Sequence, residues 1–161
     1  MNISEYNRCV DNVSDGLYCF LLKNTKERAL AQDLVQEAFM RLWERHKDVD
    51  VEKGKSWLFT TAYRAMIDHI RKQSRMETLE TDKHNPDTVE QGYSDLKEIL
   101  NKAVEQLPEI QRSVILLRDY EGYSYREIGE IAGLSESQVK VYIFRARLFL
   151  KKYIGKPEMV L

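Results

Sequence analysis

The chain has 161 residues, of which 43% are apolar and 32% charged, and its 25 basic side chains nearly balance 26 acidic ones. This composition excludes an intrinsically disordered chain and fits one ordinary domain or two small ones. No apolar run approaches the roughly 20 residues that span a bilayer, and the polar first residues predict no secretory signal. Seven glycines and three prolines leave few sites for tight turns. We therefore predict an all-α fold of helices joined by short loops.

The first strong element is an amphipathic helix predicted over residues 26–47, because its apolar residues recur at steps of one, three or four. These residues are Leu30, Leu34, Val35, Ala38, Phe39, Leu42 and Trp43. The remaining, polar surface of this helix consists of Asp33, Gln36, Glu37, Arg41 and Glu44. Upstream apolar residues between Tyr6 and Leu21 predict a partner helix.

A further helix is predicted within residues 55–76, with Ser56 as its candidate N-cap. This segment carries five basic side chains and one acidic one, and its cations alternate with Trp57, Phe59 and Tyr63. Aromatic rings stack on unpaired bases and cations hold phosphate, so the pattern is typical of a surface that binds single-stranded nucleic acid. The same aromatic residues equally fit a hydrophobic core, and the pattern alone does not separate the two interpretations.

Residues 77–93 interrupt the helical pattern. They are rich in acidic residues, poor in large apolar ones, and broken by Asn85-Pro86. We interpret the stretch as a flexible acidic linker. The prediction is thus two small helical domains, an N-terminal one over residues 1–76 and a C-terminal one over residues 94–161.

The C-terminal domain is predicted to begin with two helices. The first spans Leu96 to Leu107, and Pro108 is placed to open the second at its first turn. The second helix ends near Tyr120, where Glu121-Gly122 breaks the pattern.

Two closely spaced helices follow, over residues 124–132 and 136–152. Gly129 permits close approach of the next helix, Gly133 supplies a left-handed backbone at the turn, and Ser135 can cap the second helix. This spacing is typical of a helix-turn-helix, whose second helix lies in the major groove of DNA.

The second of these helices is strongly basic, because residues 137–156 carry six basic side chains and no acidic one. Polar groups near its N-terminus suit base edges, and the later cations suit phosphates. The alternative is an ordinary helix pair whose charged face is only solvated. The surface residues concerned are Ser137, Gln138, Lys140, Arg145, Arg147, Lys151 and Lys152.

No residue pattern indicates an enzyme or a metal site. Cys9 and Cys19 fit two reduced, packed thiols, and the three histidines lack metal-ligand spacing. Residues 53–56 resemble the end of a phosphate-binding loop, but Val49 stands where that motif needs glycine. We predict no catalytic residue, no metal, no cofactor and no small-molecule substrate.

Three segments, in this order, resemble the extracytoplasmic-function (ECF) group of sigma-70 factors, which direct RNA polymerase to promoters. They read AQDLVQEAFMRLWER at 31–45, WLFTTAYRAMIDHIRK at 57–72 and LPEIQRSVILLRDYEGYSYREIGEIAGLSESQVKVYIFRAR at 107–147. The order and the gap between the segments make the resemblance more specific than a helix-turn-helix alone. One departure is Arg64, which stands where the family commonly has asparagine.

The resemblance implies a role for each segment. The first would bind the clamp of core RNA polymerase through Asp33, Gln36, Glu37 and Arg41. The second would melt the promoter and bind its −10 element through Trp57, Arg64, Asp68, Arg71 and Lys72. The third would dock on the polymerase flap and read the −35 element through Arg126, Ser137, Gln138, Lys140, Val141, Phe144 and Arg145.

The resemblance also implies partners and a location. The partners would be core RNA polymerase, promoter DNA and an anti-sigma factor, in a bacterial cytoplasm where that inhibitor can hold the protein at the inner membrane. Two rival interpretations remain: a conventional DNA-binding regulator with residues 1–93 as a sensor or dimerisation module, and a small enzyme. Binding of core polymerase by the N-terminal domain separates the first rival from a sigma factor. Activity that survives a defective helix-turn-helix identifies the second.

Overall fold

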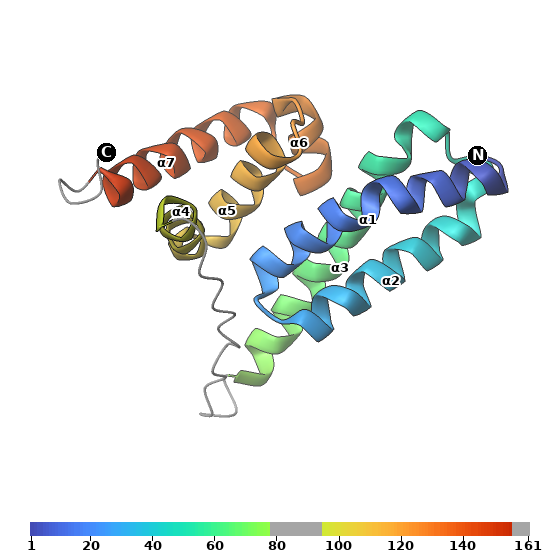
Figure 1. Ribbon diagram of the computed structural model, residues 1–161, viewed down its shortest axis with the longest axis horizontal. Coiled ribbons are helices and arrows are strands. Elements are labelled where there is room, and N and C mark those ends of the chain that lie inside the picture. Colours follow the sequence, from blue (N-terminus) through green and yellow to red (C-terminus); the bar gives the residue numbers. More distant parts are fainter. Residues whose placement is uncertain (78–94, 156–161) are drawn as a thin grey trace. The chain divides into compact units, whose positions relative to one another are not determined.

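The computed structural model describes residues 1–77 and 95–155, and within these ranges it contains helices and connecting loops but no strand (Figure 1). The chain divides into two compact units, Met1–Asp87 and Thr88–Leu161. The predicted all-α fold with two helical domains is therefore confirmed. The linker predicted at 77–93 lies almost entirely outside the described residues, so its properties and the domain boundaries stay predictions.

The first unit is a bundle of three long helices: α1 (Ile3–Thr25), α2 (Arg28–Arg45) and α3 (Gly54–Glu77). Successive helices run in opposite directions, and each packs against the other two (Figure 1). Two short 3-10 turns, η1 (His46–Asp48) and η2 (Val51–Lys53), connect α2 to α3. The short connections force the amphipathic helices to bury their apolar stripes against one another.

The turn between α1 and α2 places the start of α2 later than predicted. Lys26 adopts a left-handed conformation, with φ of 61°, and its N–H donates to the carbonyl of Leu22 at 2.8 Å. This closes α1, and α2 begins at Arg28 rather than at residue 26.

The start of α3 also differs from the prediction, because the helix begins at Gly54 and not after Ser56. Ser56 lies within the first turn, where its hydroxyl donates to the carbonyl of Lys53 at 3.2 Å. Gly54 is buried, and a Cβ there would lie 3.0 Å from the sulfur of Cys9. The assignment of Ser56 as N-cap is therefore wrong, because η2 leads directly into α3 at Gly54 and Ser56 already lies inside the helix.

The core of the first unit decides the role of two aromatic residues. Phe59 is fully buried, and its ring meets that of Phe20 edge to face at a centroid distance of 5.5 Å. Tyr63 is buried as well, whereas Trp57 is only half-buried. Phe59 and Tyr63 are thus core residues, and Trp57 alone of the three offers a partly exposed ring on α3. The surrounding core contains Leu17, Leu21, Leu34, Ala38, Leu42, Leu58, Ala62 and Met66.

The second unit consists of α4 (Asp95–Gln106), α5 (Glu109–Ile115), a π-helical turn η3 (Leu116–Tyr120), α6 (Tyr125–Ala132) and α7 (Glu136–Ile154). Helix α7 packs against α4, α5 and α6. Its buried face joins a core made of Val104, Leu107, Val114, Ile115, Leu117, Ile128, Ile131, Val139, Ile143 and Ala146.

The turn between α6 and α7 has the geometry predicted for a helix-turn-helix. Gly133 has a φ of 72°, which a side chain would strain. A Cβ on Gly129 would lie 2.6 Å from the carbonyl oxygen of Leu134, so only glycine allows this approach without a shift of the turn. The hydroxyl of Ser135 accepts the backbone N–H of Gln138 at 3.1 Å and caps α7, as predicted.

Candidate polymerase and nucleic-acid interfaces

One face of α2 carries the residues predicted to bind polymerase. Asp33, Gln36 and Arg41 are exposed, and Glu37 is half-buried. The carboxylate of Glu37 accepts a hydrogen bond from the guanidinium of Arg41 one turn later, at 2.6 Å. Their spacing puts all four on the side of α2 opposite its buried stripe, over a length of about 12 Å.

The same face contains two apolar side chains that sequence reasoning did not assign to it. Met40 is 64% exposed and Trp43 is 46% exposed. The placement of Trp43 in the buried stripe is wrong, because the neighbouring Leu42, fully buried, already fills the core position. For Met40 a signal existed: it is an apolar residue in the middle of the polar face that runs from Asp33 to Glu44.

On α3, the residues predicted to bind the −10 element share one face. Arg64, Asp68, Arg71 and Lys72 are exposed, and the half-buried Trp57 begins the row. Spacings of seven, four, three and one residues place them on the side opposite the core. The row extends for about 22 Å along the helix. The structure thus collects these five residues into a single track of three cations, one acid and one aromatic ring.

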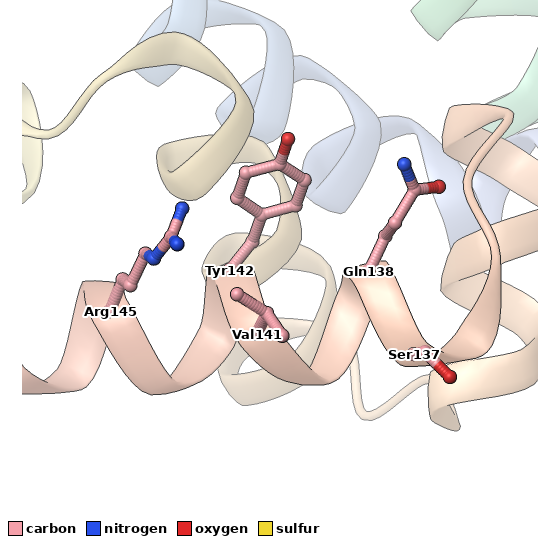
Figure 2. Close-up of a pocket in the computed structure, with 5 residues that line it drawn as sticks. All are labelled: Ser137, Gln138, Val141, Tyr142 and Arg145. Carbon is pink, nitrogen blue, oxygen red and sulfur yellow. The ribbon is translucent and has the colours of Figure 1, made fainter.

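The N-terminal half of α7 presents a shallow hollow, lined by Ser137, Gln138, Val141, Tyr142 and Arg145 (Figure 2). Figure 2 shows Gln138, Tyr142 and Arg145 rising on the same side of the helix, while Ser137 points away from them. Sequence reasoning missed Tyr142, although its position one turn after Gln138 was a usable signal.

Gln138 also takes part in capping α7, and this affects which hydrogen bonds its side chain can make with DNA. Its side-chain oxygen accepts the backbone N–H of Ser135 at 2.9 Å, which completes the capping box of α7. The amide NH₂ remains as the donor side of this group. Gln138 is therefore suited to donate to a base that presents an acceptor in the major groove; the bidentate contact that glutamine makes with adenine would need the same oxygen to accept a second hydrogen bond.

Exposed apolar side chains form a row on α7 opposite its core face. Val141 is 45% exposed, Phe144 67% and Leu148 44%, at spacings of three and four residues. The C5-methyl of thymine is the apolar group that the major groove offers. Val141 and Phe144 lie near the N-terminal half of α7, where such contacts are made, whereas Leu148 lies one turn further along.

Arg126 on α6 and Lys140 on α7 are exposed cations with an acidic neighbour on their own helix. Arg126 lies 3.6 Å from Glu130, and Lys140 lies 3.9 Å from Glu136. Ion pairs this exposed contribute little stability, so both cations can exchange their partners for phosphate.

Arg147 is held differently from these cations. Its guanidinium donates to Asp119 of η3 at 2.9 Å, and this hydrogen bond is the main reason that its pKa lies above the ordinary value. Arg147 thus fastens α7 to η3, although sequence reasoning counted it with the DNA-facing surface. Arg145, two residues earlier, lines the hollow.

The described part of the chain gathers no three histidine, cysteine or acidic side chains into a metal site. None of its described helices is both long and apolar enough to cross a membrane. Cys9 and Cys19 are free thiols, and burial raises the pKa of Cys9. Cys19 is exposed, so the expectation that both thiols are packed is wrong for this one.

Comparison with known proteins covers most of the chain. Residues 10–76 match the family described as sigma-70 region 2, and residues 97–150 match sigma-70, region 4. The ECF RNA polymerase sigma factor SigM of Bacillus subtilis (strain 168) is 35% identical over 142 residues, which cover 85% of this chain and 87% of SigM. The RNA polymerase sigma factor SigV of the same strain is 27% identical over 154 residues, covering 94% and 92%.

The fold is also similar to that of the sigma factor RpoE in its co-crystal structure with the anti-sigma factor NepR from Bartonella quintana. The TM-score is 0.83 at 24% identity, over 96% of this chain and 99% of RpoE. An identity this low supports the fold alone. The two sigma-70 regions in their order, and the identity with SigM over most of both chains, show the family: this protein belongs to the ECF group of the sigma-70 factors.

Proposed function

We propose that the two domains divide one promoter between them, with the N-terminal domain at the −10 element and the C-terminal domain at the −35 element. Family membership carries the coarser function, which is promoter recognition and transcription initiation with RNA polymerase. The observation that best supports the finer assignment is α7, which has no acidic residue after Glu136 within its bounds. This function requires no catalytic residue, cofactor or small-molecule substrate of the chain itself.

In the N-terminal domain, we assign α2 to the polymerase clamp and α3 to the −10 element. Asp33, Gln36, Glu37 and Arg41 would contact the clamp. On α3, the partly exposed ring of Trp57 is suited to stack on a base, while Arg64, Arg71 and Lys72 hold the phosphates of the separated strand. The carboxylate of Asp68 can accept a hydrogen bond from a base amino group. Capture of flipped bases offsets the few kcal/mol that unstacking each one costs.

In the C-terminal domain, which would also dock on the polymerase flap, α7 enters the major groove at the −35 element. The hydroxyl of Ser137 and the amide NH₂ of Gln138 would meet base edges, and Val141 and Phe144 would meet thymine methyl groups. Arg126, Lys140 and Arg145 would contact phosphates, which set register and affinity rather than sequence. The base-reading and phosphate-binding roles are therefore separable by mutation.

An anti-sigma factor is a further proposed partner, able to hold the protein inactive in the cytoplasm at the inner membrane. The fold supports this proposal because RpoE, with a similar fold, is bound to an anti-sigma factor in its crystal structure. The partner is tested by adding a purified candidate and measuring polymerase association, which a true inhibitor must abolish. Unchanged association at saturating candidate would rule that candidate out.

Replacement of Gln138 and of Arg145 is expected to alter promoter use in two different ways. Gln138→Ala should change the preferred base at one upstream position by about 1–3 kcal/mol, because it removes a base contact. Arg145→Ala should weaken all upstream sequences by a similar factor and reduce the salt slope of binding by about 1, because it removes a phosphate contact. Transcription by the reconstituted holoenzyme from a randomised upstream element measures both effects.

Two further variants, assayed on the same randomised upstream element, separate base contacts from helix capping. Gln138→Glu keeps the oxygen that caps Ser135 but lacks the NH₂ donor, so it should lose the preference for a base with an acceptor while α7 stays capped. Its added negative charge should also weaken binding to all upstream sequences. Phe144→Ala should lower the enrichment of thymine. A uniform loss for Gln138→Ala, with no change in the preferred base, would show that Gln138 only caps the helix.

A further inference from the structure

We infer that Met40 and Trp43 are the apolar anchor through which α2 binds polymerase, with the acidic residues around them acting as a polar rim. The inference rests on the proposed function, in which the polar face of α2 contacts the clamp. Burial of these two apolar side chains would supply affinity that the polar residues alone do not.

The exposure of these two side chains is unusual for α2. The large apolar residues Val35, Phe39 and Leu42 on the same helix are all buried. Met40 and Trp43, at 64% and 46% exposed, lie three residues apart and are therefore neighbours on the helix surface. Removing an apolar side chain from water is favourable, and Met40 forgoes most of this gain in the free protein. A partner that covers the pair recovers that free energy.

Trp43 is held in place before any partner binds. Its ring stacks on His46 at a centroid distance of 4.5 Å and an interplanar angle of 14°, and Tyr6 meets it edge to face at 5.0 Å. The hydroxyl of Tyr6 in turn donates to the backbone carbonyl of Phe39 at 2.9 Å. A pre-positioned ring loses little conformational entropy on binding. Met40, in contrast, is flexible and can adapt to the shape of a socket.

The arrangement of charges around the pair defines the chemistry of the partner. Asp33, Glu37 and Glu44 lie on the same face as Met40, and Arg41 is already paired with Glu37 at 2.6 Å. An apolar centre with a polar rim is the usual anatomy of a binding hot spot. The complementary polymerase surface should have an apolar socket bordered by basic side chains. In this division, the rim steers association and sets its salt dependence, while Met40 and Trp43 set the dissociation rate.

The test compares Met40→Ala with Met76→Ala in the full-length protein. Met76 is also 64% exposed but lies on α3, away from the polar face of α2. Met40→Ala should weaken binding to core polymerase by about 30-fold or more, the loss expected for a hot-spot residue, and Met76→Ala should leave it unchanged. Thermal unfolding should be the same for both variants. The Met40 defect should persist at high salt, whereas a defect at a rim carboxylate should depend on salt.

Three outcomes separate this inference from the function on which it rests. Normal binding by Met40→Ala together with defective binding by Glu37→Lys would overturn the anchor and leave the α2 face in place. Normal binding by both variants would overturn the polymerase assignment of that face as a whole. An equal loss for Met40→Ala and Met76→Ala would also contradict the anchor, because only one of the two lies on the face.

Discussion

Glu37→Lys is expected to eliminate association with core polymerase while the N-terminal domain stays folded. Glu37 lies outside the buried stripe of α2, and its side chain is 44% exposed. The substitution removes the pair with Arg41 and puts two cations one turn apart, which costs only a few tenths of a kcal/mol in a helix. At an interface, in contrast, a like-charge contact costs several kcal/mol, which suffices to prevent binding.

The matched control is Glu98→Lys on α4, where Glu98 and Lys102 form the same kind of pair at 3.7 Å. This variant undergoes the same charge reversal and the same loss of a helical ion pair, but on a helix of the second unit. Pull-down of core polymerase, with circular dichroism to monitor folding, should separate the two. Full binding by a folded Glu37→Lys variant would show that this face of α2 does not contact polymerase.

Phe59→Ala is expected to destabilise the N-terminal domain by about 3–5 kcal/mol, because it leaves a cavity beside Phe20 that the bundle cannot fully close. That loss is a large share of the roughly 5–15 kcal/mol that typically stabilises a domain. The same substitution at Phe144, which is 67% exposed, should change stability by no more than about 0.5 kcal/mol. Urea denaturation, followed by circular dichroism, measures both.

The comparison also separates a core role from a DNA role. Phe144→Ala should alter promoter preference without altering stability, and Phe59→Ala should do the reverse at temperatures where the domain remains folded. If Phe59→Ala kept full stability but failed to bind the single-stranded −10 sequence, the assignment of Phe59 to the core would be wrong.

Sequence periodicity predicted correctly that Asp33, Gln36, Glu37, Arg41 and Glu44 form the polar face of α2, because helical spacing determines which residues share a face. The shared face on α3 was not predicted, although the same spacing rule applies to it. Periodicity failed at the border between the buried and the exposed face of a helix, where a shift of one residue decides whether a side chain is buried. Trp43 follows the buried Leu42 but is exposed. For Phe59 the pattern left a core role and a base-stacking role open, and its complete burial decides for the core.

The helix-turn-helix was the most predictable part, because its requirements are local. The position of Gly133 requires a positive φ, and that of Gly129 leaves no space for a side chain. Ser135 immediately precedes α7 and caps it. Each of these features depends on only a few neighbouring residues. The second role of Gln138 was not predicted, since its residue type suits both a capping box and a base contact. The structure shows that its side-chain oxygen accepts the backbone N–H of Ser135 at 2.9 Å.

Transcription in vitro shows whether this protein directs RNA polymerase to promoters. Purified core polymerase would be offered a genomic promoter library with and without the full-length protein. The expected result is that the protein adds a set of start sites that share one upstream and one downstream element, and that Glu37→Lys abolishes this set. If the protein instead bound specific DNA by itself and left the start sites of core polymerase unchanged, it would act as a conventional regulator, and its role as a sigma factor would be contradicted.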